Sequence, residues 1–138
     1  MRTNFEIYDN SGVKYDGIHI DLHNNFELKS KETDGKNLLI EFLKLNDDWV
    51  HENEFAKLTF VNKSVSYEFF ENGNNDKYPE DENTLSIIGY FPKSMRDIND
   101  GFMQRNKPEN DDDIIYIFQN DKTFRISCEE IELIVKKQ

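Results

Sequence analysis

Residues 114–135 read IIYIFQNDKTFRISCEEIELIV and contain three apolar runs separated by two polar turns. Apolar side chains recur at every second position, as at Phe124, Ile126 and Cys128. The same period appears in five other runs, at 18–22, 38–42, 65–69, 114–118 and 131–135. Successive side chains of a strand point to opposite faces, so each run has one apolar and one polar face. This pattern predicts antiparallel sheets that are buried on one side.

The turn residues between these runs divide the chain into about nine short strands with little helix. We therefore expect an all-β fold, either an antiparallel β-sandwich or a partly closed barrel. One domain over residues 1–138 agrees with the usual size of a domain. Asn24-Asn25 and Asn62-Lys63 each separate two apolar runs and predict tight hairpins.

The core is expected to be aromatic, because the chain carries 11 Phe and 6 Tyr. Cys128 is the only cysteine and shares the apolar register, so it should be a buried, unreactive thiol. The lack of a disulfide favours a cytoplasmic location. The side chains predicted to be buried are Ile40, Phe42, Tyr67, Phe69, Phe118, Phe124, Ile126 and Leu133.

Acidic residues outnumber basic ones by 28 to 17, and the net charge is -11. This balance disfavours binding to nucleic acid, which needs clustered Lys and Arg, and to anionic membranes. Because residues 1–12 contain no long apolar stretch, we expect them to be neither a signal peptide nor a membrane anchor. A negative surface is complementary to a basic protein partner, although it also serves plain solubility.

Three acidic segments are candidates for binding such a partner. The first surrounds Trp49, which either anchors an interface or closes one end of the sandwich. The second is 80–82, and the third, 111–113, lies at the end of the irregular segment 92–113. A segment of this length without a strand pattern is usually functional or disordered, and residues 94–98 within it predict one helical turn. The candidate residues are Asp47, Asp48, Trp49, Glu52, Glu54, Glu80, Asp81, Glu82, Asp111, Asp112 and Asp113.

His19, Asp21 and His23 alternate along one strand and could together bind a transition metal. A further ligand from a neighbouring strand would be needed, so we interpret them as a solvated polar face. The acidic runs 80–82 and 111–113 do not have the spacing of an EF-hand loop. We expect no metal, no cofactor and no enzymatic activity, although many acid pairs leave a hydrolase as an alternative.

Residues 114–133, from Ile114-Ile115-Tyr116 to Leu133, resemble the closing hairpin and strand of small β-rich immunity proteins of bacterial polymorphic toxin systems. Residues 55–62 (FAKLTFVN) resemble another strand of these proteins. The resemblance implies a cytoplasmic antidote that binds and blocks a toxin domain. The alternative is a carbohydrate-binding sandwich that uses exposed aromatic residues. The candidates for that role are Trp49, Tyr78 and Tyr90.

Overall fold

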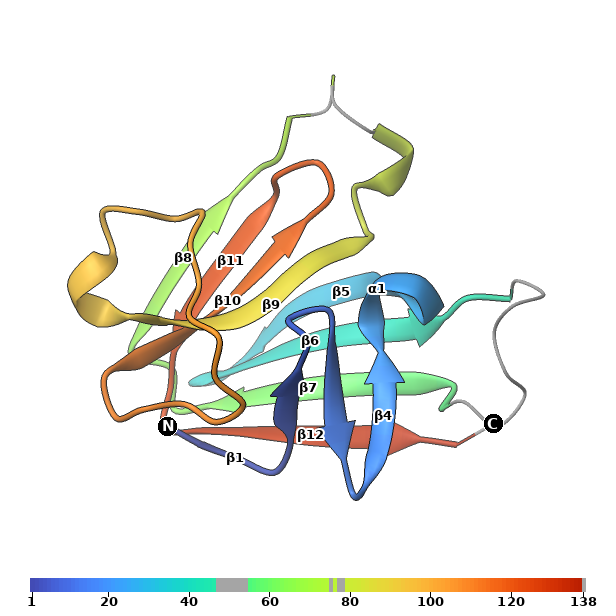
Figure 1. The fold of residues 1–138 in the computed structure, drawn as a ribbon, viewed down its shortest axis with the longest axis horizontal. Helices are drawn as coiled ribbons and strands as arrows, with labels where there is room; N and C mark the ends of the chain where they lie inside the picture. The colour runs from blue at the N-terminus through green and yellow to red at the C-terminus, as the bar shows by residue number, and fades with distance from the viewer. Residues whose placement is uncertain (47–54, 75, 77–78, 138) are drawn as a thin grey trace.

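The computed structural model describes residues 1–46, 55–74, 76 and 79–137 and arranges them in three sheets (Figure 1). The chain is 56% strand and 7% helix, which confirms the all-β prediction. Within the described residues the sheets do not close into a barrel, so the sandwich is the alternative that agrees with the structure. The described residues form twelve strands, more than the nine expected, because short strands such as Arg2–Thr3 and Gly12–Tyr15 were missed.

The largest sheet has five strands in the order β1-β12-β7-β6-β5. Its pairs are antiparallel except for β1 and β12, which are parallel. β6 has a neighbour on each side, as the apolar run at 38–42 predicts for an inner strand. The bounds are β1 (Arg2–Thr3), β5 (Phe26–Asp34), β6 (Asn37–Lys44), β7 (Lys57–Lys63) and β12 (Glu130–Lys136).

The second sheet has four antiparallel strands in the order β8-β11-β10-β9. The predicted turn at Asn120-Asp121 joins β10 to β11 as a hairpin. The bounds are β8 (Tyr67–Glu71), β9 (Leu85–Pro92), β10 (Asp112–Phe118) and β11 (Thr123–Ser127). Two short 3-10 turns flank β9, η1 (Pro79–Asp81) before it and η2 (Lys93–Met95) after it.

The third sheet is small and consists of β2 (Glu6–Tyr8), β3 (Gly12–Tyr15) and β4 (Ile18–Asp21). Figure 1 shows it in front of β7 and β12, beside the four-stranded sheet. The predicted turn after Tyr8 is present, and Asp9 and Asn10 both adopt positive φ there, at 57° and 53°. The chain then forms one helical turn, α1 (Leu22–Asn25), before it enters β5.

The core lies between the two larger sheets and is mainly aromatic. The Phe42 ring stacks on Phe118 with centroids 6.4 Å apart, and Phe60 meets Tyr116 edge to face at 6.1 Å. Phe5, next to the small sheet, contacts Phe60 at 5.3 Å, so all three sheets share one core. Aromatic pairs of this geometry contribute beyond the area that they bury.

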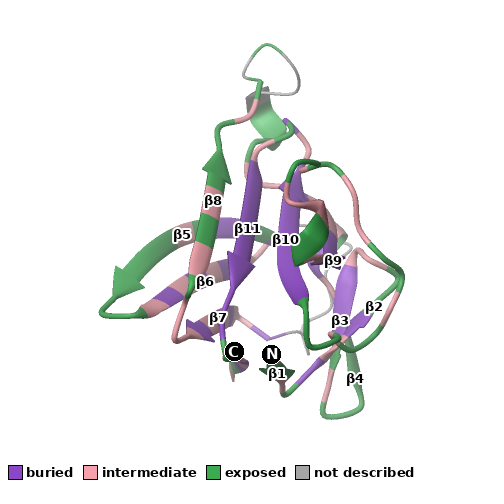
Figure 2. Cartoon of the chain, turned by 90° about the vertical axis from the view of Figure 1, so that its left-hand side faces the viewer, coloured by how far each residue is buried: buried purple, intermediate pink, exposed green. Residues whose placement is uncertain are grey.

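Both central strands of the four-stranded sheet are buried on both faces, and Figure 2 shows β10 and β11 buried along their whole length. Their inner face packs on the five-stranded sheet. Their outer face is covered by the long segment that connects β9 to β10. The prediction of one polar face is therefore wrong for β10 and β11, whose second face is covered by another segment of the chain. An uninterrupted apolar run such as 114–118 is typical of a strand covered on both sides.

The hairpins predicted at Asn24-Asn25 and Asn62-Lys63 are wrong. Asn24 and Asn25 end α1, where the Asp21 carboxylate accepts a hydrogen bond from the Asn24 backbone N at 3.0 Å. Asn62 lies inside β7 and is buried, and its amide donates to the carbonyl of Leu38 at 3.1 Å. In each case the flanking strands belong to different sheets, so the chain crosses between sheets where a local turn was expected.

The predicted burial of Tyr67 and Phe69 is also wrong, because both are only half-buried. β8 pairs with β11 so that Phe70 lies beside Phe124, which puts Phe70 on the inner face and Phe69 beside Arg125 on the outer face. Apolar residues occur at both odd and even positions of β8, so the spacing of apolar residues could not identify its inner face. The other six side chains predicted to be buried are buried.

Two edge strands of the larger sheets, β5 and β8, carry charges on their inner faces. Lys31 lies beside Ile40 in register, and its ammonium stands 3.4 Å from the centroid of the Phe70 ring. Glu68 lies beside Ile126 in register, and burial lowers the pKa of Lys31 while Glu68 opposes that shift. Inward charges on edge strands discourage edge-to-edge pairing, and the bulge in β5 has the same effect.

Candidate partner-binding surface

The segment 93–111 crosses the outer face of the four-stranded sheet and is the longest connection between described strands (Figures 1 and 2). It begins with η2, where sequence reasoning expected a helical turn over 94–98. Met103 then bridges to Tyr90 of β9, with a hydrogen bond of 2.7 Å from the Met103 backbone N to the Tyr90 carbonyl. The rest of the segment is irregular, and side chains of the sheet hold it in place.

Arg125 of β11 is the main anchor of this segment. Its Nε donates to Asp113 at 2.9 Å, and both side chains are fully buried. Its remaining nitrogens donate to the backbone carbonyl of Pro92 at the end of β9 (2.8 Å) and to two carbonyls of the segment, those of Met95 (3.1 Å) and Ile98 (2.8 Å). One buried guanidinium therefore supplies hydrogen bonds to the backbone where the chain leaves β9, which removes the cost of leaving buried carbonyls unpaired.

A second arginine completes this arrangement from the loop side. Arg96 forms two hydrogen bonds to Asp113, at 2.9 and 2.8 Å, and its guanidinium lies 3.6 Å from the centroid of the Tyr67 ring. The hydrogen bond to Asp113 raises the pKa of Arg96, so the Arg96 guanidinium stays charged. The buried carboxylate is thus shared by two arginines, one from the sheet and one from the segment that covers it.

The far end of the segment has a similar anchor at Asp112, which is buried. Arg105 donates twice to the Asp112 carboxylate, with both distances at 2.8 Å. The same carboxylate accepts the backbone N of Glu109 at 2.8 Å. Two adjacent aspartates at the start of β10 therefore fix the two halves of the segment.

This result corrects the interpretation of the acidic run 111–113. Asp112 and Asp113 are 2% and 0% exposed, so neither carboxylate can meet a partner at the surface. Asp111 is exposed and remains a candidate. Sequence reasoning missed the burial because the arginines that pair with these carboxylates lie 7, 17 and 12 residues away.

Two glycines let the middle of the segment pack closely on β9. A Cβ at Gly101 would stand 2.6 Å from the ring of Phe91, and one at Gly89 would stand 2.9 Å from the Cβ of Phe102. Real Cβ atoms are not found this close to other atoms. The segment is therefore held by ion pairs at both ends and by close packing between them.

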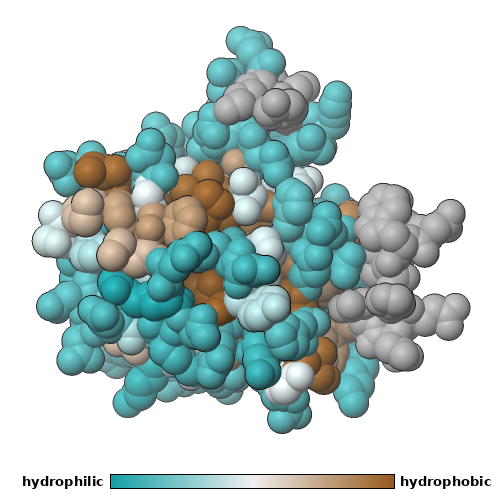
Figure 3. Space-filling view, viewed as in Figure 1, coloured by the Kyte–Doolittle hydropathy of each residue, from teal (hydrophilic) through white to brown (hydrophobic). Residues whose placement is uncertain are grey.

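The outer side of the segment is partly apolar. Ile98 and Met103 are both 41% exposed, and Met95 and Phe102 are half-buried next to them in sequence. Figure 3 shows apolar side chains gathered over this segment, on the left of the view. We call Met95, Ile98, Phe102 and Met103 the apolar patch.

A pocket of about 580 Å³ adjoins the apolar patch and shares Ile98 with it. Ile117 and Thr123 of the sheet form part of its lining, and Asn99 of the segment lies beside them. None of its described lining residues is Lys or Arg. Its acidic lining residues come from β8, the segment and the β10–β11 turn; they are Glu71, Asp97, Asp100 and Asp121.

The other predicted partner-binding residues lie elsewhere. Glu80, Asp81 and Glu82 are exposed at and just after η1, near the start of β9. The remaining candidates fall outside the described residues: Asp47, Asp48, Trp49, Glu52 and Glu54. Glu80, Asp81 and Glu82 precede β9 and Asp111 precedes β10, and these antiparallel strands begin at opposite ends of the sheet, so the two described acidic segments lie apart. The structure adds Asp97 and Asp100, which sequence reasoning did not single out.

The strand predicted to carry His19, Asp21 and His23 on one face ends at Asp21. His19 packs edge to face on Tyr8 with centroids 4.3 Å apart. His23 belongs to α1, and its Nδ1 lies 2.6 Å from the Leu85 carbonyl. Across the described residues, no group of three His, Cys, Asp or Glu side chains could hold a metal ion.

Two further predictions about single residues can be compared with the structure. Cys128 is buried as expected, and burial raises the pKa of its thiol to about 11. Tyr90, a candidate for binding a sugar, is 0% exposed, so it cannot offer its ring to a ligand. Trp49 and Tyr78 lie outside the described residues.

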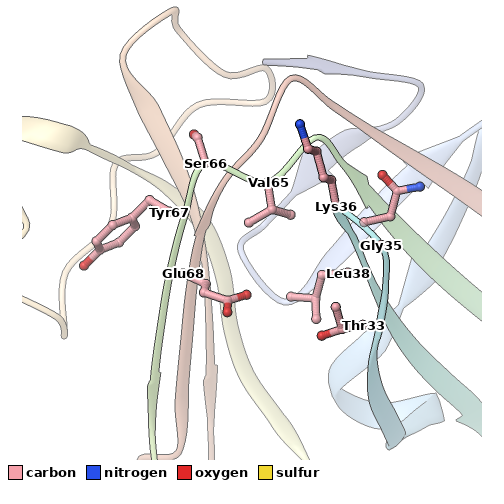
Figure 4. Close-up of a pocket in the computed structure, with 9 residues that line it drawn as sticks. Thr33, Gly35, Lys36, Leu38, Val65, Ser66, Tyr67 and Glu68 are labelled. Atoms are coloured by element: carbon pink, nitrogen blue, oxygen red, sulfur yellow. The ribbon is translucent and has the colours of Figure 1, made fainter.

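A second pocket, of about 340 Å³, lies between the β5–β6 turn and the start of β8 (Figure 4). Thr33, Lys36 and Leu38 face Val65 and Glu68 across it. Its lining mixes both charges with apolar groups and gives no clear preference for a ligand.

Comparison with known proteins found no matching family model, curated protein or solved structure. In the part of the chain that the structure describes, no helix has the length and apolar character needed to cross a membrane.

Proposed function

We propose that this chain is a protein-binding domain that acts as an immunity-type inhibitor of a basic toxin domain in the bacterial cytoplasm. It acts by binding and not by catalysis. The observation that carries the proposal is the segment 93–111, whose inner side is fixed by buried ion pairs while its outer side exposes apolar and acidic groups. Long loops held in one conformation on a rigid scaffold are common binding elements.

The charge of the chain supports a basic partner. A net charge of -11 attracts a positive surface over long range and speeds its encounter. The exposed carboxylates at 80–82 and at Asp111 add negative charge at other places on the surface. The resemblance of residues 55–62 and 114–133 to immunity proteins points to a toxin as that partner.

Co-expression tests the proposal directly. Immunity genes stand just downstream of their toxin genes, so the protein encoded immediately upstream should arrest growth when produced alone. Growth should recover when this chain is produced with it, and the two should co-elute as a complex. An upstream product that is harmless, acidic or unable to bind would contradict the proposal.

Salt dependence tests the electrostatic part in the purified complex. The Debye length falls from about 10 Å at 0.1 M salt to about 3 Å at 1 M. The association rate should therefore fall as salt rises, while the dissociation rate should change less. An association rate that does not respond to salt would remove the argument from charge.

A further inference from the structure

We propose that the pocket beside Ile98 receives a lysine or arginine side chain of the partner, and that the apolar patch receives an apolar residue next to it. The inference rests on the proposed function and names the surface and the chemistry of the partner segment. The occupant is thus a basic amphipathic segment of a protein.

The pocket has the composition that a long cationic side chain requires. Ile98 and Ile117 supply an apolar wall for its aliphatic stem, and Asp97, Asp100 and Glu71 supply carboxylates for its charged end. Lys and Arg bury their stems along apolar surface and keep the charged group among polar partners. With no Lys or Arg among the described lining residues, the carboxylates near the pocket favour a cation from outside.

The apolar patch explains why the partner segment should be amphipathic. Ile98 belongs both to the patch and to the pocket, so an apolar side chain of the partner that lies beside the bound cation would contact Ile98. Exposed methionine and isoleucine side chains next to a charged rim are common at protein interfaces. The flexible Met side chains can adapt to apolar residues of different shape.

The buried ion pairs prepare this surface for binding. Arg125 holds the carbonyl of Ile98 at 2.8 Å and that of Met95 at 3.1 Å, so the residues that carry the patch have a fixed backbone. A surface that is already ordered loses less conformational entropy when a partner binds. The buried Arg125 therefore keeps the backbone of the binding surface in one conformation before the partner arrives.

Peptide titration monitored by amide chemical shifts tests the inference. The probe is a short blocked extended peptide in which leucine and arginine take every second position with serine between them, so that they share one face, and it is compared with peptides that replace leucine by serine or arginine by glutamate. We expect shifts centred on 95–103 and Ile117, and weaker binding of both comparison peptides. Asp97→Asn combined with Asp100→Asn should weaken binding by about 5- to 10-fold.

The matched control removes two exposed carboxylates elsewhere, with Glu80→Gln and Glu82→Gln, and should weaken binding by less than about 2-fold. Ile98→Ala should weaken binding about as much as the Asp97 and Asp100 pair, and melting temperatures should show that all variants fold. Equal losses in the two charge pairs, shifts centred elsewhere or no binding would overturn the inference.

The two proposals can fail separately. If the upstream product binds with an affinity that Asp97→Asn and Asp100→Asn do not change, the proposed function stands and the proposed binding site at the pocket is wrong. If the peptide binds at the pocket but no upstream toxin is neutralised, the proposed binding site stands and the toxin-inhibitor function is wrong.

Discussion

Asp113→Asn should strongly destabilise this protein although it conserves the shape of the side chain. The carboxylate of Asp113 is fully buried and, among the described residues, is the acidic group that forms an ion pair with Arg125, at 2.9 Å. It also accepts two hydrogen bonds from Arg96, at 2.9 and 2.8 Å. Asparagine keeps the shape but removes the charge, so the Arg125 guanidinium stays buried with only neutral acceptors.

The size of the effect follows from the geometry. Removing one partner of a buried ion pair costs about 3–5 kcal/mol, because the other charge is left uncompensated. For a domain of this size, each kcal/mol lowers the melting temperature by about 4 °C, so we expect a loss of about 12–20 °C. Arg96→Gln is the matched control, since Asp113 keeps Arg125 and the Arg96 side chain is 30% exposed. Its cost should be about 1 kcal/mol.

Denaturant unfolding followed by circular dichroism measures the free energy of unfolding of both variants. Amide hydrogen exchange at Met103, whose backbone N donates to Tyr90, reports release of the segment without global unfolding. Asp113→Asn should accelerate this exchange as well as lower stability. A loss below about 1 kcal/mol with unchanged exchange would refute the claim that Arg125 and Asp113 anchor the segment.

Three other predictions concern the core, the thiol and the sheet edges. Phe124→Ala should cost about 3–5 kcal/mol in denaturant unfolding, and Phe69→Ala, on the half-buried outer face, less than half as much. Burial raises the pKa of Cys128 from 9.0 to about 11, so its thiol should react with iodoacetamide at pH 8 at least about 100-fold more slowly in the folded than in the unfolded protein. Because the folded pKa is the higher one, the stability from this group is complete below pH 9 and should be lost as pH rises toward 11. Replacing Lys31 and Glu68 with Val should leave the unfolding free energy of the monomer undiminished but cause self-association in light scattering, and a variant that stays monomeric at high concentration would contradict the edge argument.

The candidate site was the part least accessible to sequence reasoning. The run at 111–113 reads as a solvated acidic tract, and its neighbours in sequence give no sign that two of its carboxylates are buried. The signal that was available is the uninterrupted run at 114–118, which requires a cover on both faces of β10. That cover has to come from an adjacent segment, and the long connection before β10 is the one that supplies it.

Local sequence determined where strands form and which side of most of them is apolar. Phe124, Ile126 and Leu133 are buried as their period predicts, because alternation is a property of the extended backbone itself. The turn after Tyr8 and the one at Asn120-Asp121 also follow from local residues.

Tertiary structure decided which strands pair, which face of β8 is inner and which charges are buried. Asn62 lies inside a strand because β7 and β8 belong to different sheets, and Tyr67 faces outward because β8 takes its register from β11. Asp113 is buried because Arg96 and Arg125 meet it from positions 17 and 12 residues away. Period and turn propensity act over a few residues, whereas pairing and ion-pair burial depend on groups that only the folded chain brings together.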